Sequence, residues 1–317
     1  DGVYAVPAGR NGVGLARLSS TERVMTDLDS LREQLGSATS AAPIRDLDRL
    51  GNTLLAPVMG RLAERVYLVP SGPLNGLPFD ALRLNGEFLA ASRQVIQLGS
   101  LASLGTVPAL PDDFTRRVFL AGNPQSGQDL FSYGVTTSTE IAAVRDRFVG
   151  DGLHIVQGVA LRRDEFLDER FNDAGLVHLA MPGRIDLALP ERSRLLLSGG
   201  GEDPAAEFLG AEDIRGFRLQ ASLVVLSETA FAERSTSPMD SRLGLISDFH
   251  AAGADRVIAT LWPADDRESA AFMSDFYTAL ERLGEVESAL FETRKRQLTT
   301  GNGANFGTWS GFQLFIR

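Results

Sequence analysis

Two short stretches of the sequence carry side chains that could perform chemistry. One runs from His178 to Asp186 and the other is Ser227-Glu228-Thr229, and each lies at the end of an apolar run typical of a buried strand. Hydroxyl, carboxylate and imidazole groups held together can hydrolyse an acyl bond, because the imidazole takes the proton from the attacking hydroxyl. The carboxyl ends of parallel strands lie at one edge of a sheet, so we expect the two stretches to meet there.

The same side chains also fit ordinary structural roles. Ser, Glu and Thr that follow a strand frequently cap the next helix. Three histidines lie on separate predicted elements without the spacing of metal ligands, which favours structural hydrogen bonding: His154, His178 and His250. Asp186 and Asp213 fall in predicted turns and could recognise a basic side chain, although a solvated surface position is favoured for both. Trp262 ends a further predicted strand.

Strands and helices alternate from residue 115 onward. Apolar runs predict strands at 118–124, 153–158, 175–183, 223–228, 256–262 and 311–317. Helices are predicted at 137–148, with Thr137 and Glu140 as the capping pair, at 161–171, and after the capping pair Asp265 and Glu268. Continuous apolar strands alternating with amphipathic helices favour an α/β fold with a mostly parallel sheet flanked by helices.

The chain is predicted to divide near residue 112, within the stretch TVPALPDD. Residues 1–112 are expected to form a smaller first subdomain, and residues 113–317 the main α/β core. In the first part, Ser19 and Glu22 have the spacing of a capping box ahead of a helix that ends near Gly36. Apolar residues at helical spacing predict a second helix from Ile44 to Leu62.

The amino-acid composition disfavours some classes of binding partner and excludes chemistry that depends on cysteine. The chain has 317 residues, a formal net charge of −10 and no cysteine. The acidic balance disfavours nucleic acid and anionic membranes as partners. Without cysteine there is no disulfide, no thiolate metal ligand and no cysteine nucleophile, and we expect neither a metal nor a cofactor.

No signal peptide or apolar span of about 20 residues is recognisable, so a cytoplasmic location is expected. The sequence begins with Asp1, which predicts that it is a piece of a longer protein.

Six motifs, in this order, resemble those of the CHAT domain. They are VYLVPSGPLNGLPFDAL, GLVHLA-P-G, SLVVLSET, GLISDFHAAGADRVIATLWPADD, FMSDFYTAL and WSGFQLF, and the similarity runs from about residue 15 to the C-terminus. CHAT domains are caspase-like cysteine peptidases, related in fold to caspases and separase. The resemblance therefore implies a caspase-like core at 113–317, preceded by a degenerate caspase-like half. It also implies a longer protein that carries tetratricopeptide (TPR) helical repeats.

The sequence departs from the family at both positions that the resemblance assigns to catalysis. The family strand H-x-A-T-H-G has the general base as its second histidine, where this chain has Pro182. In the family strand V-L-S-A-C-E-T-G the cysteine is the nucleophile. An ungapped alignment places Thr229 there, whereas an alignment with two residues deleted leaves no residue at that position. His178 matches the family's first histidine, and Gly183 matches the glycine whose N–H contributes to the oxyanion hole.

These departures predict a catalytically inactive caspase-like domain that binds a protein or peptide. The expected cleft comprises His178, Gly183, Asp186, Ser227, Glu228, Thr229 and Trp262. One alternative is an active hydrolase with Ser227 or Thr229 as the nucleophile and His178 or His250 as the base. Another is an architectural role, in which the domain caps a repeat array. No pattern indicates an oligomeric state.

Overall fold

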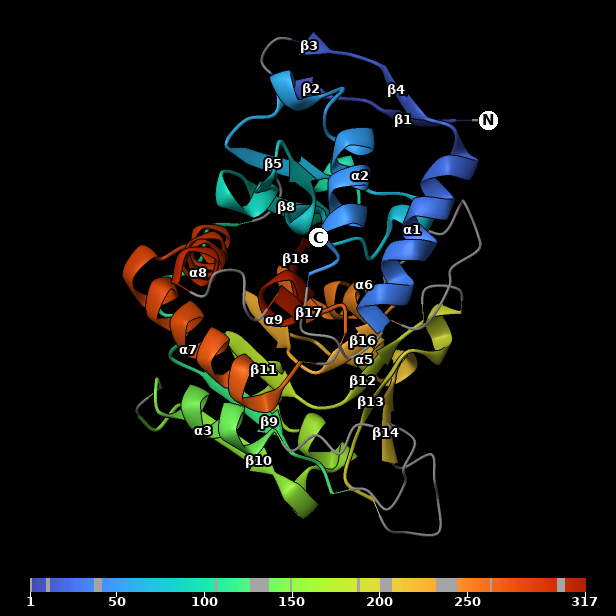
Figure 1. Cartoon of the computed structure of the whole chain (residues 1–317). Helices are drawn as coiled ribbons and strands as arrows, with labels where there is room; N and C mark the ends of the chain where they lie inside the picture. Colours follow the sequence, from blue (N-terminus) through green and yellow to red (C-terminus); the bar gives the residue numbers. More distant parts are fainter. Residues whose placement is uncertain are drawn as a thin grey trace.

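The structure is a computed structural model of the chain. It describes residues 2–9, 12–36, 42–105, 108–125, 137–148, 150–186, 189–199, 207–231, 244–262, 264–300 and 306–317. Figure 1 shows a central sheet with helices on both sides, a small second sheet at the lower right, and a two-stranded ribbon at the top.

The central sheet has eight strands within the described residues. They are β5 (Arg65–Leu68), β8 (Gln94–Leu98), β9 (Val118–Gly122), β10 (Leu153–Gln157), β11 (Leu176–Ala180), β15 (Leu223–Leu226), β17 (Arg256–Thr260) and β18 (Phe312–Ile316). Their order across the sheet is β10-β9-β11-β15-β17-β18-β8-β5. The pairing is parallel throughout except between β17 and β18, which confirms the predicted mostly parallel sheet.

A second sheet extends two of these strands. Its order is β14 (Phe208–Gly210), β13 (Arg194–Leu196), β12 (Gly183–Ile185) and β16 (Thr229–Phe231). β12 follows β11 after a two-residue interruption, and β16 follows β15 in the same way. β12 and β16 run parallel to one another, whereas the other pairs of this sheet are antiparallel.

Adjacent residues of the central strands pack into two cores on opposite faces of the sheet. In β9, Leu120 belongs to a core shared with α1, α2, α3, α7 and α8, whereas Phe119 belongs to the core shared with α4, α5 and α6. The α-helices are α1 (Thr21–Gly36), α2 (Ile44–Leu54), α3 (Ser138–Arg145), α4 (Glu169–Asn172), α5 (Ala211–Gly216), α6 (Leu245–Ala252), α7 (Asp266–Leu283), α8 (Val286–Thr300) and α9 (Phe306–Gly311). The strict alternation follows from the two-residue period of a strand.

The remaining elements are short. The N-terminal ribbon comprises β1 (Val3–Ala5), β2 (Ala8–Gly9), β3 (Gly12–Val13) and β4 (Ala16–Ser19), and a small hairpin comprises β6 (Arg83–Leu84) and β7 (Glu87–Phe88). Single 3₁₀ turns occupy Met59–Arg61, Gly72–Leu74, Phe79–Ala81, Leu89–Ala91, Leu101–Ser103, Gly158–Ala160, Arg163–Phe166 and Pro190–Arg192.

Two predicted helices differ from those in the structure. The helix predicted at 161–171 is a 3₁₀ turn followed by α4, because the carboxylate of Asp168 accepts the N–H of Arg170 at 2.7 Å and starts a new helix there. The helix predicted from Ile44 to Leu62 ends at Leu54. Pro57 follows three residues later, and a proline disfavours helical backbone in the residue before it.

The sheet draws strands from both sides of residue 112. β5 and β8 precede this residue, the other six strands follow it, and β18 lies between β17 and β8. The division of the chain into two domains at this point stays a prediction.

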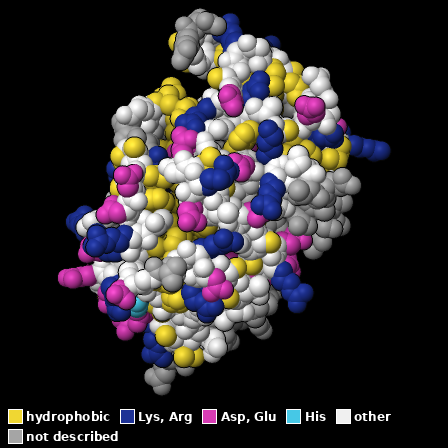
Figure 2. All heavy atoms as spheres, turned by 90° about the vertical axis from the view of Figure 1, so that its left-hand side faces the viewer, with side chains coloured by type: hydrophobic (Ala, Val, Ile, Leu, Met, Phe, Trp, Pro, Cys, Tyr) yellow, Lys and Arg dark blue, Asp and Glu magenta, His cyan; other side chains and the backbone are white. Residues whose placement is uncertain are grey.

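The surface on the side of α7 and α8 carries charges of both signs. Figure 2 faces this side, and Lys and Arg side chains are interspersed there with Asp and Glu. This visible face therefore has no continuous basic tract of the kind that binds a phosphate backbone. Among the helices that the structure describes, none is long and apolar enough to cross a lipid bilayer.

Candidate functional site

The two stretches singled out by their chemistry meet where β11 and β15 end. Beyond Pro182 the chain continues as β12, beyond Glu228 it continues as β16, and Gly183 lies opposite Thr229 in the parallel pair. We call the pairing of β12 with β16 the tip ladder. The N–H of Gly183 donates to the carbonyl oxygen of Glu228 at 3.0 Å. This N–H, which the resemblance assigns to an oxyanion hole, is therefore used within the fold.

The hydroxyl of Thr229 is fully buried and bonded to the neighbouring strand. Its Oγ1 donates to the carbonyl oxygen of Thr260 at 2.9 Å, and Oγ1 of Thr260 donates to the carbonyl oxygen of Thr229 at 2.7 Å. Pro182 is also buried, and its carbonyl oxygen accepts the N–H of Leu196 at 2.8 Å. The two residues that the resemblance places at the nucleophile and base positions are thus fixed by backbone bonds, and neither contacts an imidazole.

His178 points from the middle of β11 into the core beneath α3 and α7. Its side chain has no exposed surface. Nδ1 lies 2.8 Å from the hydroxyl oxygen of Tyr277 on α7, and Nε2 lies 3.2 Å from Oε1 of Glu140 on α3. The contact with Glu140 does not meet the geometry of a hydrogen bond, and it is an ion pair only when the imidazole is protonated.

Glu140 is the central residue of this buried group, although its spacing from Thr137 predicts a helix-capping residue. Its fully buried carboxylate reaches His178 with Oε1, while Oε2 accepts the hydroxyl of Ser227 at 3.0 Å. The predicted capping pair of α3 is wrong, because the hydroxyl of Thr137 donates to the carbonyl oxygen of Ala180 at 2.7 Å instead. A glutamate in the first turn of a helix is common, so no sequence signal distinguished Glu140 from a cap.

The start of α3 is capped by a carboxylate from another helix. The backbone N–H groups of Thr139 and Glu140 donate to Asp266 of α7, at 3.1 and 3.0 Å. Asp265 caps α7 itself by accepting the N–H groups of Arg267 and Glu268, as predicted. These bonds hold α3 and α7 together above the carboxyl ends of β11 and β15.

The order of groups in this network differs from that of a hydrolytic triad. In a triad the imidazole stands between the hydroxyl and the carboxylate, so that it can take the hydroxyl proton. Here the carboxylate of Glu140 stands between the hydroxyl of Ser227 and the imidazole of His178. This arrangement connects three elements of the fold, and the base that contacts the Ser227 hydroxyl is the buried carboxylate of Glu140 and not an imidazole.

Glu228 adds a second buried carboxyl beside the first. Only 4% of the residue is exposed, and within the described part of the chain no hydrogen bond to its Oε1 meets the geometric criteria. Burial raises the pKa of Glu228 well above its ordinary value of 4.5. Three nearby carboxylates raise this pKa further: Glu140, Asp266 and Asp265. The Glu228 carboxyl therefore stays protonated at a pH at which an exposed glutamate is ionised.

The other histidines lie away from the tip ladder. His250 is near the end of α6, which leads into the start of β17, and its Nδ1 is 2.9 Å from the carbonyl oxygen of Ala254. Burial lowers the pKa of His250 to about 4. His154 lies on β10, and its Nε2 is 3.5 Å from Oε2 of Glu165. Neither imidazole is placed to serve as a base for Ser227 or Thr229.

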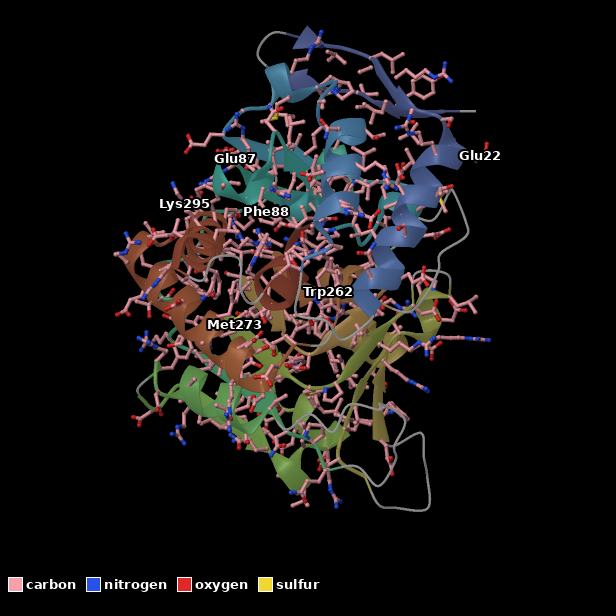
Figure 3. All side chains as sticks on the ribbon, viewed as in Figure 1. Glu22, Glu87, Phe88, Trp262, Met273 and Lys295 are labelled. Atoms are coloured by element: carbon pink, nitrogen blue, oxygen red, sulfur yellow. The ribbon has the colours of Figure 1, made fainter. Side chains whose placement is uncertain are left out.

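The remaining candidate residues stabilise turns or the edge of the site. Oδ1 of Asp186 accepts the N–H of Leu189 at 2.9 Å, and Oδ2 of Asp213 accepts the N–H of Gly210 at 2.9 Å. Trp262 follows β17, and Figure 3 shows it beside α9. Its indole N–H donates to the carbonyl oxygen of Gly307 at 2.7 Å, and it is half-buried.

Removing the hydroxyl of Tyr277 is expected to destabilise the fold without changing its shape. In Tyr277→Phe, Nδ1 of His178 loses its hydrogen-bond partner in a fully buried position, which costs about 1–3 kcal/mol of unfolding free energy. Urea titration measures the loss, with Tyr67→Phe on the exposed side of β5 as the control. Equal stability of the two variants would contradict the role given to this hydroxyl.

Residues 45–316 match the model of the CHAT domain. The chain belongs to the CHAT domain family. The matched residues include β11, β12, β15 and β16, so the tip ladder lies within the CHAT domain.

The chain is also similar to curated relatives and to solved structures. Over 106 residues, the chain is 32% identical to tetratricopeptide repeat protein 28 of Mus musculus and 31% identical to that of Homo sapiens. The similarity covers 33% of this CHAT domain chain and 4% of each relative. Among solved structures, the separase–securin complex of Saccharomyces cerevisiae matches with a TM-score of 0.51 at 12% identity, covering 79% of this chain and 15% of that one. The Arg-specific cysteine proteinase gingipain R matches with a TM-score of 0.46 at 10% identity, covering 94% of this chain and 68% of that one.

Proposed function

We propose that this CHAT domain does not hydrolyse peptide bonds and instead binds a protein or peptide partner. The observation that supports the proposal is the tip ladder. Pro182, which precedes the ladder, occupies the position that the resemblance gives to the family's base, and Thr229 occupies the nucleophile position in the ungapped alignment, whereas the gapped alignment leaves that position empty. A prolyl ring cannot accept a proton, and the chain holds no cysteine to form a thiolate. Covalent peptidase chemistry lacks both of its groups here.

A replacement nucleophile is the alternative function, and the contacts of the two hydroxyls argue against it. Ser227 donates to the Glu140 carboxylate and Thr229 donates to a backbone carbonyl. Attack by a hydroxyl requires a base within hydrogen-bond reach and access to the substrate. The bonds given for Thr229 involve no such base, and the hydroxyl of Ser227 and its Glu140 partner are both fully buried.

The chemistry of the partner follows from charge and from family context. A chain with a net charge of −10 attracts a positively charged segment by electrostatic steering, so a basic protein or peptide is the favoured ligand. The similarity to tetratricopeptide repeat protein 28 supports a setting within a longer repeat-containing protein, where the domain regulates or recruits rather than cuts.

One experiment with two readouts tests this proposal. The purified chain is mixed with a library of basic fluorogenic peptides, and both cleavage and the fluorescence of Trp262 are followed. We expect no cleavage and a saturable change in Trp262 fluorescence, because Trp262 is half-buried at the carboxyl end of β17 while the other tryptophan, Trp309, is buried. Trp262→Phe is the control for the optical signal, and Pro182→His/Thr229→Cys is the control for a cleavage-competent site.

Two results would contradict the proposal. Cleavage that disappears in Ser227→Ala or Thr229→Ala would identify an active hydrolase with a replacement nucleophile. A fluorescence signal that none of the basic peptides changes saturably would remove the binding role.

A further inference from the structure

The outward side of the N-terminal ribbon consists almost entirely of apolar side chains. Exposed and half-buried residues alternate along both of its strands, as the two-residue period of a strand requires. The exposed set, which we call the ribbon face, is Tyr4, Val6, Ala8, Val13, Leu15 and Arg17. Its four large hydrophobic residues have exposed fractions between 53% and 74%. A solvated strand face ordinarily carries polar residues, so the ribbon face has the composition of a surface that another element covers.

The opposite side of the ribbon already packs on the rest of the chain. Val3 and Leu18, at the base of the ribbon, pack against the core that α1 and α2 share. Further out, Gly14 leaves room for the guanidinium of Arg61, with which an added methyl group would collide. The ribbon is therefore held from its inner side, and the ribbon face cannot bury itself by turning inward.

The dimensions of the ribbon face match one side of an α-helix. Its residues form three rows across the two strands: Tyr4 with Arg17, Val6 with Leu15, and Ala8 with Val13. The rows span about 14 Å along the strands, which lie about 5 Å apart. A helix is about 10 Å across, so it covers both strands, and about nine of its residues run the length of the face. Apolar side chains at i, i+3 and i+7 of that helix would contact the three rows.

Arg17 determines which charge the covering helix should carry. Its guanidinium lies beside the ring of Tyr4 at one end of the ribbon face, because a methyl group added at Gly2 would approach both side chains within 3.3 Å. Within the described residues 2–9 and 12–19, Arg17 is the only charged residue. A cation at the end of an apolar face favours a carboxylate at the corresponding end of the partner.

A second copy of the chain is a poorer occupant of this face. A surface of about 14 Å by 10 Å is several-fold smaller than the roughly 800 Å² that each partner contributes to a stable dimer. Two copies would also bring together two chains of net charge −10, and neither ribbon face supplies a carboxylate to the Arg17 of the other. The same net charge disfavours a surface of anionic lipids.

We propose that the ribbon face binds an amphipathic α-helix whose apolar stripe ends in an acidic residue. The apolar side chains of the helix pack on the three rows, and its carboxylate pairs with Arg17. The small area makes the contact weak for a free helix, with a Kd of about 0.1 mM. Figure 1 shows the ribbon at the top of the molecule, away from β12 and β16, so this contact does not depend on the proposed function.

Two synthetic helical peptides of about 16 residues test this proposal. Both carry leucines at i, i+3 and i+7, and they differ only in having Glu or Lys one turn beyond the last leucine. Fluorescence anisotropy of the labelled peptides, titrated with the native chain, measures the two Kd values. We expect the Glu peptide to bind about tenfold more tightly, because the Lys peptide places a second cation beside Arg17.

Three variants make the outcome specific to the ribbon face. Val6→Ser/Leu15→Ser removes the apolar side chains of the central row and should weaken binding of the Glu peptide by about tenfold or more. Val159→Ser/Leu167→Ser changes two similarly exposed residues that follow β10, and it should bind like the native chain. Arg17→Glu should reverse the preference, so that the Lys peptide binds more tightly than the Glu peptide.

Several results would overturn the proposal. One is a Glu peptide that does not bind the native chain at about 1 mM, and others are equal affinities for the two peptides or unchanged binding in Val6→Ser/Leu15→Ser. A native dimer that sedimentation shows to be lost in Val6→Ser/Leu15→Ser would assign the face to a second copy. Binding to phosphatidylserine vesicles that the same variant lacks would assign it to a lipid surface.

Discussion

Replacing Asp80 with alanine is expected to lower the free energy of unfolding by about 3–5 kcal/mol, the largest single-residue effect that we predict for this fold. Asp80 has no exposed surface, and its Oδ2 lies 2.8 Å from Nη2 of the buried Arg294 on α8. The amide of Gln313 on β18 also donates to both carboxylate oxygens, at 2.9 and 3.1 Å. Asp80→Ala leaves the Arg294 guanidinium in the core without its carboxylate.

The expected loss of unfolding free energy arises because the Arg294 charge stays buried without a partner, and not because the ion pair itself strongly stabilises the fold. Arg294→Met combined with Asp80→Leu removes both charges, so this double variant should recover much of the loss. Urea unfolding measures both free energies. Asp146→Ala, which breaks an exposed pair with Arg145, is the control and should cost less than about 1 kcal/mol. A cost for Asp80→Ala as small as that of the control would refute the prediction.

The free energy of unfolding of the native chain is expected to contain a pH-dependent part due to Glu228. The pKa of Glu228 is raised in the folded chain by burial and then by its acidic neighbours, whereas the unfolded chain has the ordinary 4.5. Between these two values the folded state binds more protons than the unfolded state, so stability falls as the pH rises, by about 1.4 kcal/mol for each pH unit. Below 4.5 this stabilisation is fully present.

Glu228→Gln isolates this part because the amide is isosteric and does not ionise. The difference in unfolding free energy between the variant and the native chain should increase with pH and then become constant above the folded pKa of Glu228. Denaturant titrations at several pH values, with Glu281→Gln as the exposed control, measure this difference. A difference independent of pH would show that Glu228 has the same pKa in both states.

The fold class could be read from the sequence because the strands are continuous apolar runs. β9, β11, β15 and β17 are buried on both faces and therefore consist almost entirely of apolar residues. No local feature of the sequence indicates the order of the strands across the central sheet. The partners of β18 lie far apart in the chain, and only the tertiary packing places β8 and β17 on its two sides.

The candidate site was predicted in its location but not in its network. The strand predicted at 175–183 is β11, which ends at Ala180, and Gly183 lies opposite Thr229 just beyond it. Glu140 was missed because a side chain in the first turn of α3 has the same sequence pattern whether it caps the helix or turns into the core. Burial decided between these roles, and burial depends on α7 and β11.

The resumption of the strands beyond the tips was also not predicted. β12 and β16 are three residues each and pair with one another, so each depends on the other for its backbone bonds. Such short segments have no apolar period that could be recognised before their partner is known.

Because β18 lies between β8 and β17, the central sheet cannot be completed during translation until residues 312–316 have been synthesised. More than 200 residues separate the end of β8 from the start of β18, which at 5–20 residues per second amounts to roughly 10 to 40 s of translation. Until β18 emerges, β8 and β17 have no partner on the sides that it will occupy, and both present open backbone groups. The nascent chain therefore exposes the open edge of β8 throughout this interval and the open edge of β17 during the synthesis of residues 261–311. Chaperone binding during that time would protect it from aggregation.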